Sequence, residues 1–322
     1  LKNCVLFTLS ANQELGKKVA AALGMELSPV SVKRFPSGEI IAESIETVRG
    51  KNVYIIQSTC PPVNENLMEL LIFVDSLKRS SAAEINVIIP YFGYARQDRK
   101  AKPRQPISAR LVADLLKVSG VTRVVTVDLH APQIQGFFSC LVDELATAPL
   151  YVATFLQDSH FNTKNLVTVS PDHGGVTRAR KIADGLNTPL AIIDKRRNSR
   201  LEPEVMNIIG SVEGKDCLIV DDMIDTAGSA CAAADALINA GAKSVKIIAT
   251  HAVLSDPAFE RLSKSKFNQI IVSDSIPLPE RFKELNCKVI SLAPMLAASI
   301  KKIQLGEPLS VVYDMYKVED HD

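Results

Sequence analysis

Residues 218–229 read Leu-Ile-Val-Asp-Asp-Met-Ile-Asp-Thr-Ala-Gly-Ser. The apolar run 218–220 predicts a buried strand that ends in two adjacent carboxylates, Asp221 and Asp222. A short loop, 225–229, then opens directly into an Ala-rich helix. In open α/β sheets ligands bind beyond the carboxyl ends of the strands, and a helix N-terminus offers N–H groups to a phosphate. Because carboxylates before such a loop can hold sugar hydroxyls or a hydrated divalent ion, the stretch predicts a site for a phosphorylated sugar.

The same alternation of strand and helix recurs along the chain. Segments such as 66–80 and 108–118 carry apolar residues at three- and four-residue spacing, which is typical of helices. This pattern predicts an α/β fold of mainly parallel sheets covered by helices. The apolar runs that predict strands are 53–56, 85–89, 123–127, 166–169, 190–193, 217–220, 245–250 and 269–272.

Two stretches of the chain repeat one another. Residues 107–130 align without a gap on residues 228–251, and both predict a helix, a glycine, a strand and a histidine. We expect two tandem copies of one α/β domain, residues 1–147 and 148–322, with the C-terminal tail a candidate to pack back on the first domain. The identical pairs are Ser108/Ser229, Ala109/Ala230, Ala113/Ala234, Asp114/Asp235, Leu116/Leu237, Gly120/Gly241, Val124/Val245 and His130/His251.

Composition excludes several classes of protein. Lys and Arg total 37 against 36 for Asp and Glu, so no global field attracts nucleic acid or an anionic membrane. The six cysteines show no metal-ligand spacing, which favours a reduced chain over a disulfide framework. No signal peptide and no run of 18 apolar residues is present. These observations predict a soluble cytoplasmic protein.

A basic segment, residues 94–107, occupies in the first copy the place of the acidic loop in the second. Such a run is often a solvated loop or a nucleic-acid contact, but the near-zero net charge and the lack of interleaved aromatic residues disfavour nucleic acid. The chain has no P-loop motif, so a nucleotide must be held by other groups. Guanidinium groups suit phosphate oxygens, and the segment therefore predicts a polyphosphate site. Its basic residues are Arg96, Arg99, Lys100, Lys102 and Arg104.

Two further basic residues follow the predicted strand 190–193. Lys195 and Arg197 are alternate residues of an extended segment, so both can reach one phosphoryl group. The alternative is ordinary surface decoration. His130 also follows a strand, and a lone histidine there is more often structural than catalytic.

Several separated motifs, in order, resemble those of the class I ribose-phosphate pyrophosphokinases, also called phosphoribosyl pyrophosphate (PRPP) synthetases. They are Tyr94-Ala-Arg-Gln-Asp-Arg-Lys100, Asp128-Leu-His-Ala-Pro-Gln-Ile-Gln-Gly-Phe-Phe138, Ser170-Pro-Asp-His-Gly-Gly-Val-Thr-Arg-Ala-Arg180, Asp194-Lys-Arg-Arg197 and the opening stretch. The resemblance implies two phosphoribosyltransferase-like domains and transfer of the β,γ-diphosphate of ATP to the C1 hydroxyl of ribose 5-phosphate. It also implies Mg2+ as the cofactor and a homohexamer built as a trimer of dimers.

The resemblance assigns roles to matching residues. For catalysis these are Lys195 and Arg197, and for Mg2+ His130 and Asp172. Because Mg2+ prefers oxygen ligands, Asp172 is the better-founded metal contact. The expected ATP contacts are Phe35, Ser37, Gly38, Glu39, Arg96, Gln97 and His130. The expected ribose-5-phosphate contacts are Arg197, Asp221, Asp222, Asp225, Thr226, Ala227, Gly228 and Ser229.

The chain departs from the family pattern at a few positions. Ser37 stands where Asp or Asn usually faces the adenine, and Ser139 replaces an Asp after Gly-Phe-Phe. The tail after Ser310 is atypical, and in the family the tail helps to form the regulatory site for phosphate or ADP. The positions that match a regulatory site are Arg49, Ser81, Arg104, Gln135 and Asp143.

Two other functions fit part of this pattern. A catalytically silent, PRPP-synthetase-associated regulatory subunit carries an insertion near the catalytic Lys/Arg segment, whereas here residues 194–197 run directly into 198–205. A salvage phosphoribosyltransferase is typically a single domain and needs no duplicated ATP-binding half. The repeat and the intact motifs therefore favour the enzyme.

Overall fold

The computed structural model describes residues 3–196 and 205–317 and divides the chain into two compact units. Unit 1 combines the described residues up to Ala146 with Ser275–Pro277 and Ser291–Val312. Unit 2 combines Thr147–Asp274, as far as described, with Leu278–Ile290 and the residues from Tyr313 onward. The C-terminal segment thus returns to the first unit before the chain ends. No helix in the described part is long and apolar enough to cross a membrane.

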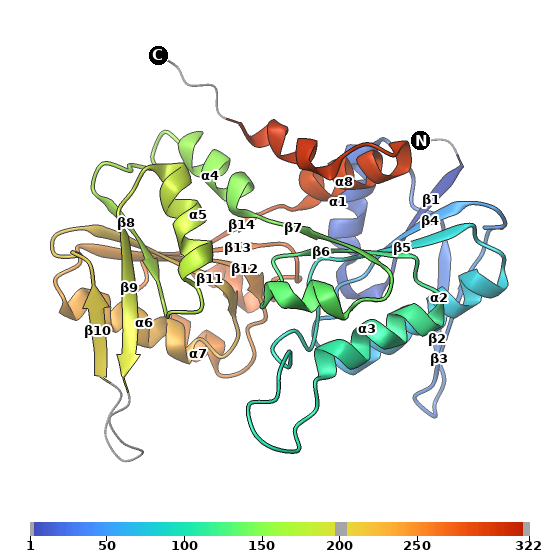
Figure 1. The fold of residues 1–322 in the computed structure, drawn as a ribbon, viewed down its shortest axis with the longest axis horizontal. Coiled ribbons are helices and arrows are strands. Elements are labelled where there is room, and N and C mark those ends of the chain that lie inside the picture. The colour runs from blue at the N-terminus through green and yellow to red at the C-terminus, as the bar shows by residue number, and fades with distance from the viewer. Residues whose placement is uncertain (1–2, 197–204, 318–322) are drawn as a thin grey trace. The chain divides into compact units, whose positions relative to one another are not determined.

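Unit 1 is a parallel sheet between two pairs of helices (Figure 1). The strand order is β1-β4-β5-β6-β7, with β1 (Cys4–Thr8), β4 (Asn52–Ile56), β5 (Glu84–Ile89), β6 (Arg123–Val127) and β7 (Leu141–Leu145). Helices α1 (Gln13–Leu23) and α8 (Ala293–Leu305) cover one face, and α2 (Val63–Arg79) and α3 (Ser108–Ser119) cover the other. Its short 3-10 helices are η1 (Ser10–Asn12) and η2 (Pro132–Phe137), and η4 (Leu309–Tyr316) contains the boundary between the two units, after Val312. Because both faces are covered, the central strands are almost entirely buried and mostly apolar.

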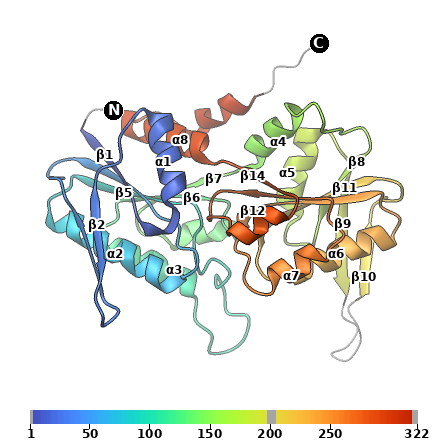
Figure 2. The ribbon, with the colours of Figure 1, turned by 180° about the vertical axis from the view of Figure 1, so that it is seen from behind.

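A separate antiparallel hairpin belongs to unit 1. Its strands are β2 (Val30–Arg34) and β3 (Ile40–Ser44), and β3 packs against α2 (Figure 2). Ala42 of β3 is buried, whereas the tip of the hairpin is exposed. The apolar pattern had predicted no strand in this region, because only one side of the hairpin meets the core.

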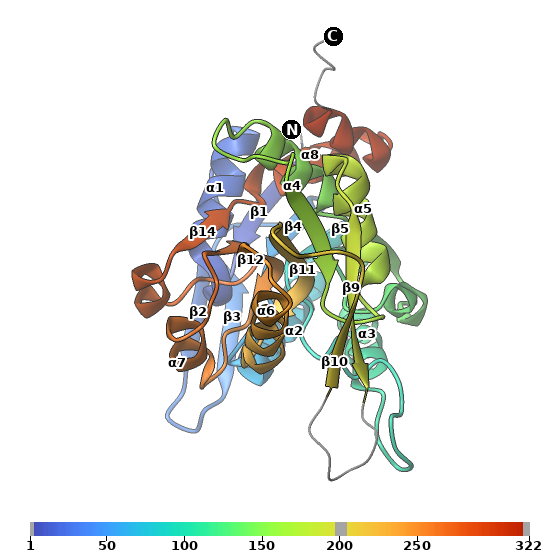
Figure 3. The same cartoon turned by 90° about the vertical axis from the view of Figure 1, so that its left-hand side faces the viewer.

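Unit 2 is a larger sheet between two pairs of helices (Figure 3). Its order is β10-β9-β8-β11-β12-β13-β14, parallel except where the edge strand β10 runs antiparallel to β9. The strands are β8 (Leu166–Ser170), β9 (Leu190–Arg196), β10 (Val205–Ile209), β11 (Asp216–Ile224), β12 (Ser244–Ala252), β13 (Gln269–Ser273) and β14 (Cys287–Ile290). Helices α4 (Ala148–Leu156) and α5 (Val176–Leu186) lie on one face, and α6 (Gly228–Asn239) and α7 (Ala258–Ser263) lie on the other. A 3-10 turn, η3 (Glu280–Glu284), precedes β14.

The repeated sequence corresponds to the same structure in both units. In unit 1, α3 follows β5 and leads to β6; in unit 2, α6 follows β11 and leads to β12. Gly120 and Gly241 follow these helices with φ of 126° and 88°, a region that favours glycine. The strands predicted from apolar runs are all present. Strand β11 extends beyond the predicted apolar run 217–220 to Ile224, so that both acids are part of the strand.

Candidate active site

Asp221 and Asp222 lie where the unit 2 sheet narrows. Strand β11 pairs with β8 only as far as Ile219, whereas its pairing with β12 continues to Ile224. The acids therefore lie just beyond the carboxyl end of β8, the position at which parallel sheets bind ligands. Asp222 is buried and donates its backbone N–H to Asp221 Oδ1 at 2.8 Å. The two carboxylates lie close enough for the charge of Asp222 to act on Asp221.

One arginine faces both acids. Arg178 Nη1, on α5, lies 3.5 Å from Asp222 Oδ1 and 4.0 Å from Asp221 Oδ1. Burial and the neighbouring charge of Asp222 nevertheless raise the pKa of Asp221 well above the ordinary range of a carboxyl. Arg178 therefore offsets only part of the cost of holding two acids together. The sequence interpretation quoted Arg178 within a motif but gave it no role, because its contact with the acids depends on how α5 packs on the sheet.

The loop after β11 begins the helix α6 in a strained conformation. Ala227 has φ of +59°, in the left-handed region, and its carbonyl accepts the N–H of Cys231 at 2.9 Å. Arg261 Nη1 of α7 donates to the carbonyl oxygen of Thr226 at 2.9 Å, which fixes the loop from outside. The predicted phosphate contacts thus come together at the N-terminus of α6, where backbone N–H groups can bind an anion. These contacts are Asp225, Thr226, Ala227, Gly228 and Ser229.

The loop after β8 lies close to strand β9. Asp172 Oδ1 accepts the N–H of Gly175 at 2.9 Å, and His173 Nε2 lies 2.9 Å from Asp194 Oδ1. Asp194 is buried and directly precedes Lys195, whose backbone completes a ladder pair with Met206. The side chain of Lys195 and the whole of Arg197 lie outside the described residues. His173 is a second residue that the sequence interpretation passed over.

In unit 1, the predicted adenine-side residues form the tip of the hairpin. The N–H of Phe35 donates to the Glu39 carbonyl oxygen at 2.9 Å, and Gly38 donates to the Phe35 carbonyl oxygen at 2.8 Å with φ of +90°. Ser37 Oγ donates to Glu39 Oε2 at 2.8 Å. The ring of Phe35 is 50% exposed. A large aromatic ring presented to solvent on a closed turn is a surface on which a flat base can stack.

The basic segment between β5 and α3 forms an exposed loop without a helix, as its prolines predict. Tyr94 begins it with φ of +65° and accepts the N–H of Gln97 at 2.9 Å. Gln97 Oε1 accepts from Ser108 Oγ at 2.5 Å, which ties the loop to the start of α3. Arg96 is exposed, and so is His130 in the loop after β6. Unit 1 therefore carries the predicted ATP contacts on three segments, and unit 2 carries the predicted sugar contacts.

The predicted regulatory residues are only partly brought together. Arg49 Nη1 donates to Ser81 Oγ at 3.1 Å. Asp143 instead pairs with Arg123, and Gln135 donates to Glu144. Arg104 lies in the exposed loop with φ of +68°.

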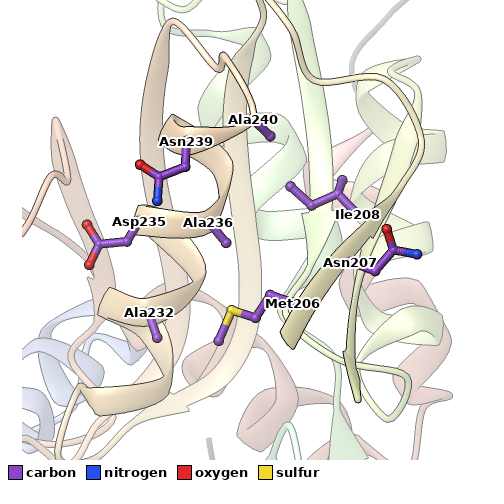
Figure 4. Close-up of a pocket in the computed structure, with 8 residues that line it drawn as sticks. All are labelled: Met206, Asn207, Ile208, Ala232, Asp235, Ala236, Asn239 and Ala240. Carbon is purple, nitrogen blue, oxygen red and sulfur yellow. The ribbon is translucent and has the colours of Figure 1, made fainter. Parts of the chain in front are cut away.

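No cluster of three potential metal ligands from His, Cys, Asp and Glu exists in residues 3–196 and 205–317. This does not exclude Mg2+, which commonly binds through one or two carboxylates together with water and substrate phosphates. The carboxylates of Asp172, Asp221 and Asp222 suit that mode of binding. An open groove of about 660 Å³ between α6 and β10 is separate from these residues (Figure 4). It is lined by Met206, Asn207, Ile208, Ala232, Asp235, Ala236, Asn239 and Ala240 and contains none of the predicted contacts.

Comparison with known proteins identifies the family. Residues 4–120 match the N-terminal domain of ribose phosphate pyrophosphokinase, and residues 142–280 match the phosphoribosyl transferase domain. The chain is 52% identical to the ribose-phosphate pyrophosphokinase of Fusobacterium nucleatum, over 97% of this chain and 98% of that one. It is also 52% identical to ribose-phosphate pyrophosphokinase 1 of Streptococcus pneumoniae, over 97% of each chain.

A solved structure agrees with these relatives. Phosphoribosylpyrophosphate synthetase from Mycobacterium smegmatis matches with a TM-score of 0.89 and 43% identity, over 95% of this chain and all of that one. The two units are thus phosphoribosyltransferase-like domains, as the sequence predicted. The chain belongs to the ribose-phosphate pyrophosphokinase family.

Proposed function

We propose that the chain transfers the β,γ-diphosphate of ATP to the C1 hydroxyl of ribose 5-phosphate, giving PRPP and AMP, with the two substrates held by different units. One observation carries this proposal. At the carboxyl end of β11, the acid pair Asp221 and Asp222 is followed by Ala227 in the left-handed conformation and then by the N-terminus of α6. That arrangement suits a sugar phosphate, with hydroxyls at the acids and phosphate at the helix.

On the sugar side, the carboxyl groups of Asp221 and Asp222 accept hydrogen bonds from ribose hydroxyls. Arg178 supplies a positive charge that faces both acids. The 5-phosphate binds the backbone N–H groups at the start of α6, which Arg261 steadies through Thr226.

On the nucleotide side, the hairpin tip presents Phe35 for base stacking, with Ser37, Gly38 and Glu39 beside it in the turn. Arg96, Gln97 and His130 supply polar contacts to the phosphates and the ribose of ATP. Ser37 has a hydroxyl in place of the usual carboxylate or amide, so we expect weaker discrimination between purine nucleotides.

In the reaction, the C1 oxygen attacks the β-phosphorus in line and AMP departs. Phosphoryl-type transfer depends mainly on positioning and on neutralising charge. Lys195 and Arg197 supply the positive charge that neutralises the phosphate oxygens. Asp194, which contacts His173, lies on β9 and directly precedes Lys195. Mg2+, held through Asp172 and a contact from His130, would neutralise charge on the phosphate oxygens when bound.

We further assign the enzyme to the cytoplasm, in keeping with its six free cysteines, and expect a homohexamer assembled as a trimer of dimers. ADP and phosphate are the expected effectors, at a site that includes the Arg49–Ser81 contact. No nucleic-acid or membrane partner is expected from a net charge of +1.

The test is AMP formation from ATP in the presence of Mg2+, with and without ribose 5-phosphate. AMP release that requires ribose 5-phosphate, together with PRPP detected by mass spectrometry, supports the proposal. ATP hydrolysis independent of the sugar phosphate contradicts it, as does PRPP consumption in the presence of a purine base without any PRPP synthesis.

A further inference from the structure

Arg34 is the last residue of β2 before the hairpin tip. It pairs with Ile40 in the final rung of the ladder and directly precedes Phe35. The apolar base of the hairpin packs against α2, but an isolated two-stranded hairpin has little stability of its own. The orientation of the tip therefore depends on the contacts that the last residue pair, Arg34 and Ile40, makes with the rest of unit 1.

Two acids of α2 face Arg34. Its Nη1 lies 2.8 Å from Glu65 Oε2, and its Nη2 lies 3.8 Å from Glu69 Oε2. The side chain of Glu65 is half exposed, and solvent-exposed ion pairs contribute little to stability. The side chain of Glu69, in contrast, has no exposed surface. A charge taken out of water needs compensation, so the second contact is the one that matters.

The other oxygen of Glu69 is bound to the edge of the unit 1 sheet. Glu69 Oε1 accepts the N–H of Ser10 at 2.8 Å and Nε2 of Gln57 at 3.4 Å. Gln57 Oε1 in turn accepts the N–H of Ala11 at 3.1 Å. Ser10 and Gln57 follow the carboxyl ends of β1 and β4. Within the described residues, Glu69 Oε2 has no hydrogen-bond donor, and Arg34 is the cation recorded against it.

We propose that Arg34 and the buried Glu69 form a latch that orients the hairpin tip, so that Arg34 is a positioning residue for ATP. The buried carboxylate is fixed to the sheet by Ser10 and Gln57 and attracts the guanidinium at the base of the tip. Phe35 and Glu39 are thereby held in one direction relative to α2. This inference rests on the proposed nucleotide role of the hairpin.

The first experiment is a double-mutant cycle of Arg34→Gln and Glu69→Gln, with Lys33→Gln as the matched control. Lys33 is the neighbouring exposed cation of the same strand. Loss of precise positioning weakens productive binding, so we expect Arg34→Gln to raise KM for ATP by about tenfold. KM for ribose 5-phosphate and kcat should stay within about twofold, because the hairpin tip is proposed to contact the adenine side of ATP and neither the sugar phosphate nor the reacting groups.

Non-additivity is the decisive result. If Arg34 acts through Glu69, the double variant is no worse than either single variant, and Arg34→Lys recovers part of the affinity because it keeps the charge. An Arg34→Gln effect of full size in the Glu69→Gln background overturns the latch, since Arg34 would then contact the nucleotide itself. An unchanged KM for ATP in Arg34→Gln also overturns it, provided that Phe35→Ala raises that KM.

A second readout separates the latch from the nucleotide assignment. Amide hydrogen exchange of the substrate-free protein measures the tip directly, through the N–H groups of Phe35 and Gly38, which are bonded within the turn. Arg34→Gln should speed exchange there, and Lys33→Gln should not; equal exchange in both variants overturns the latch. If exchange rises but Phe35→Ala leaves KM for ATP unchanged, the latch stands and the proposed nucleotide role of the hairpin fails.

Discussion

His173 Nε2 lies 2.9 Å from Asp194 Oδ1, so the loop after β8 is joined to the strand that carries Lys195. The loop also contains Asp172, the proposed metal carboxylate. Asp194 is buried and directly precedes Lys195, so the contact fixes the residue next to the proposed catalytic lysine. The loop of the proposed metal carboxylate and the strand of the proposed catalytic lysine are thus joined by one contact.

Replacement of Lys195 should affect the chemical step. We expect Lys195→Ala to lower kcat by about a hundredfold or more with little change in KM for ATP, because its charge acts mainly in the transition state. Steady-state rates of AMP formation measure both constants, and thermal unfolding checks that the variant is folded. Unchanged kcat in a folded variant would remove Lys195 from the mechanism.

Replacement of Arg178 should affect the sugar side. Arg178→Gln leaves Asp221 and Asp222 without the cation that faces them, so we expect KM for ribose 5-phosphate to rise by about tenfold and KM for ATP to change much less. Arg180→Gln is the matched control, since Arg180 is an exposed arginine of the same helix. If KM for ATP rises instead, the acid pair belongs to the nucleotide site.

In the substrate-free protein, the acid pair should make the free energy of unfolding depend on pH. Burial, followed by the charge of Asp222, raises the pKa of Asp221 to about 8. The folded state therefore holds a proton that the unfolded chain releases near its ordinary pKa of about 4. The contribution of this bound proton to the free energy of unfolding is fully present below about pH 4 and is lost as the pH rises through about 8.

Asp221→Asn tests this dependence because an amide does not ionise. We expect the melting temperature of the variant, relative to the native protein, to increase between about pH 5 and about pH 8. Differential scanning calorimetry at fixed ionic strength measures it. A difference that stays constant over this range, or that falls, would show that Asp221 is ionised throughout.

Gly16 offers a test of packing in unit 1. Alanine normally stabilises a helix interior relative to glycine by about 1 kcal/mol. Here a Cβ at position 16 would lie 2.3 Å from Thr8 Oγ1 and 2.5 Å from Thr8 Cβ, on the buried strand β1. We therefore expect Gly16→Ala to destabilise the protein by about 1–3 kcal/mol, as overpacking does.

Chemical denaturation measures that free energy of unfolding. The control is Gly136→Ala, because a Cβ at position 136 meets no atom within 4 Å. Adding Thr8→Ala to Gly16→Ala should restore part of the lost stability. A stabilising Gly16→Ala would contradict close packing of α1 against β1.

Much of the fold could be predicted from apolar periodicity. Strands such as β4 and β13 contain unbroken apolar runs because helices cover both faces of the sheet, and the repeat revealed the shared α/β domain. The hairpin β2–β3 was missed because its strands are mostly half exposed, which leaves no apolar run and no clean alternation. The return of α8 to unit 1 depends on its packing against α1, which no local pattern records.

The sequence by itself determined the family, the reaction and the identity of the acidic loop, because strand, acids and helix start are contiguous and their chemistry is carried by residue type. Only the tertiary structure decided what those residues face. Arg178 of α5 faces the acid pair on β11, and Arg261 of α7 binds the loop that follows it. Glu69 of α2 is buried and faces Arg34 of the hairpin. Contacts between segments far apart in the chain, and the loss of solvent that raises the pKa of Asp221, arise from packing of the sheet and its helices.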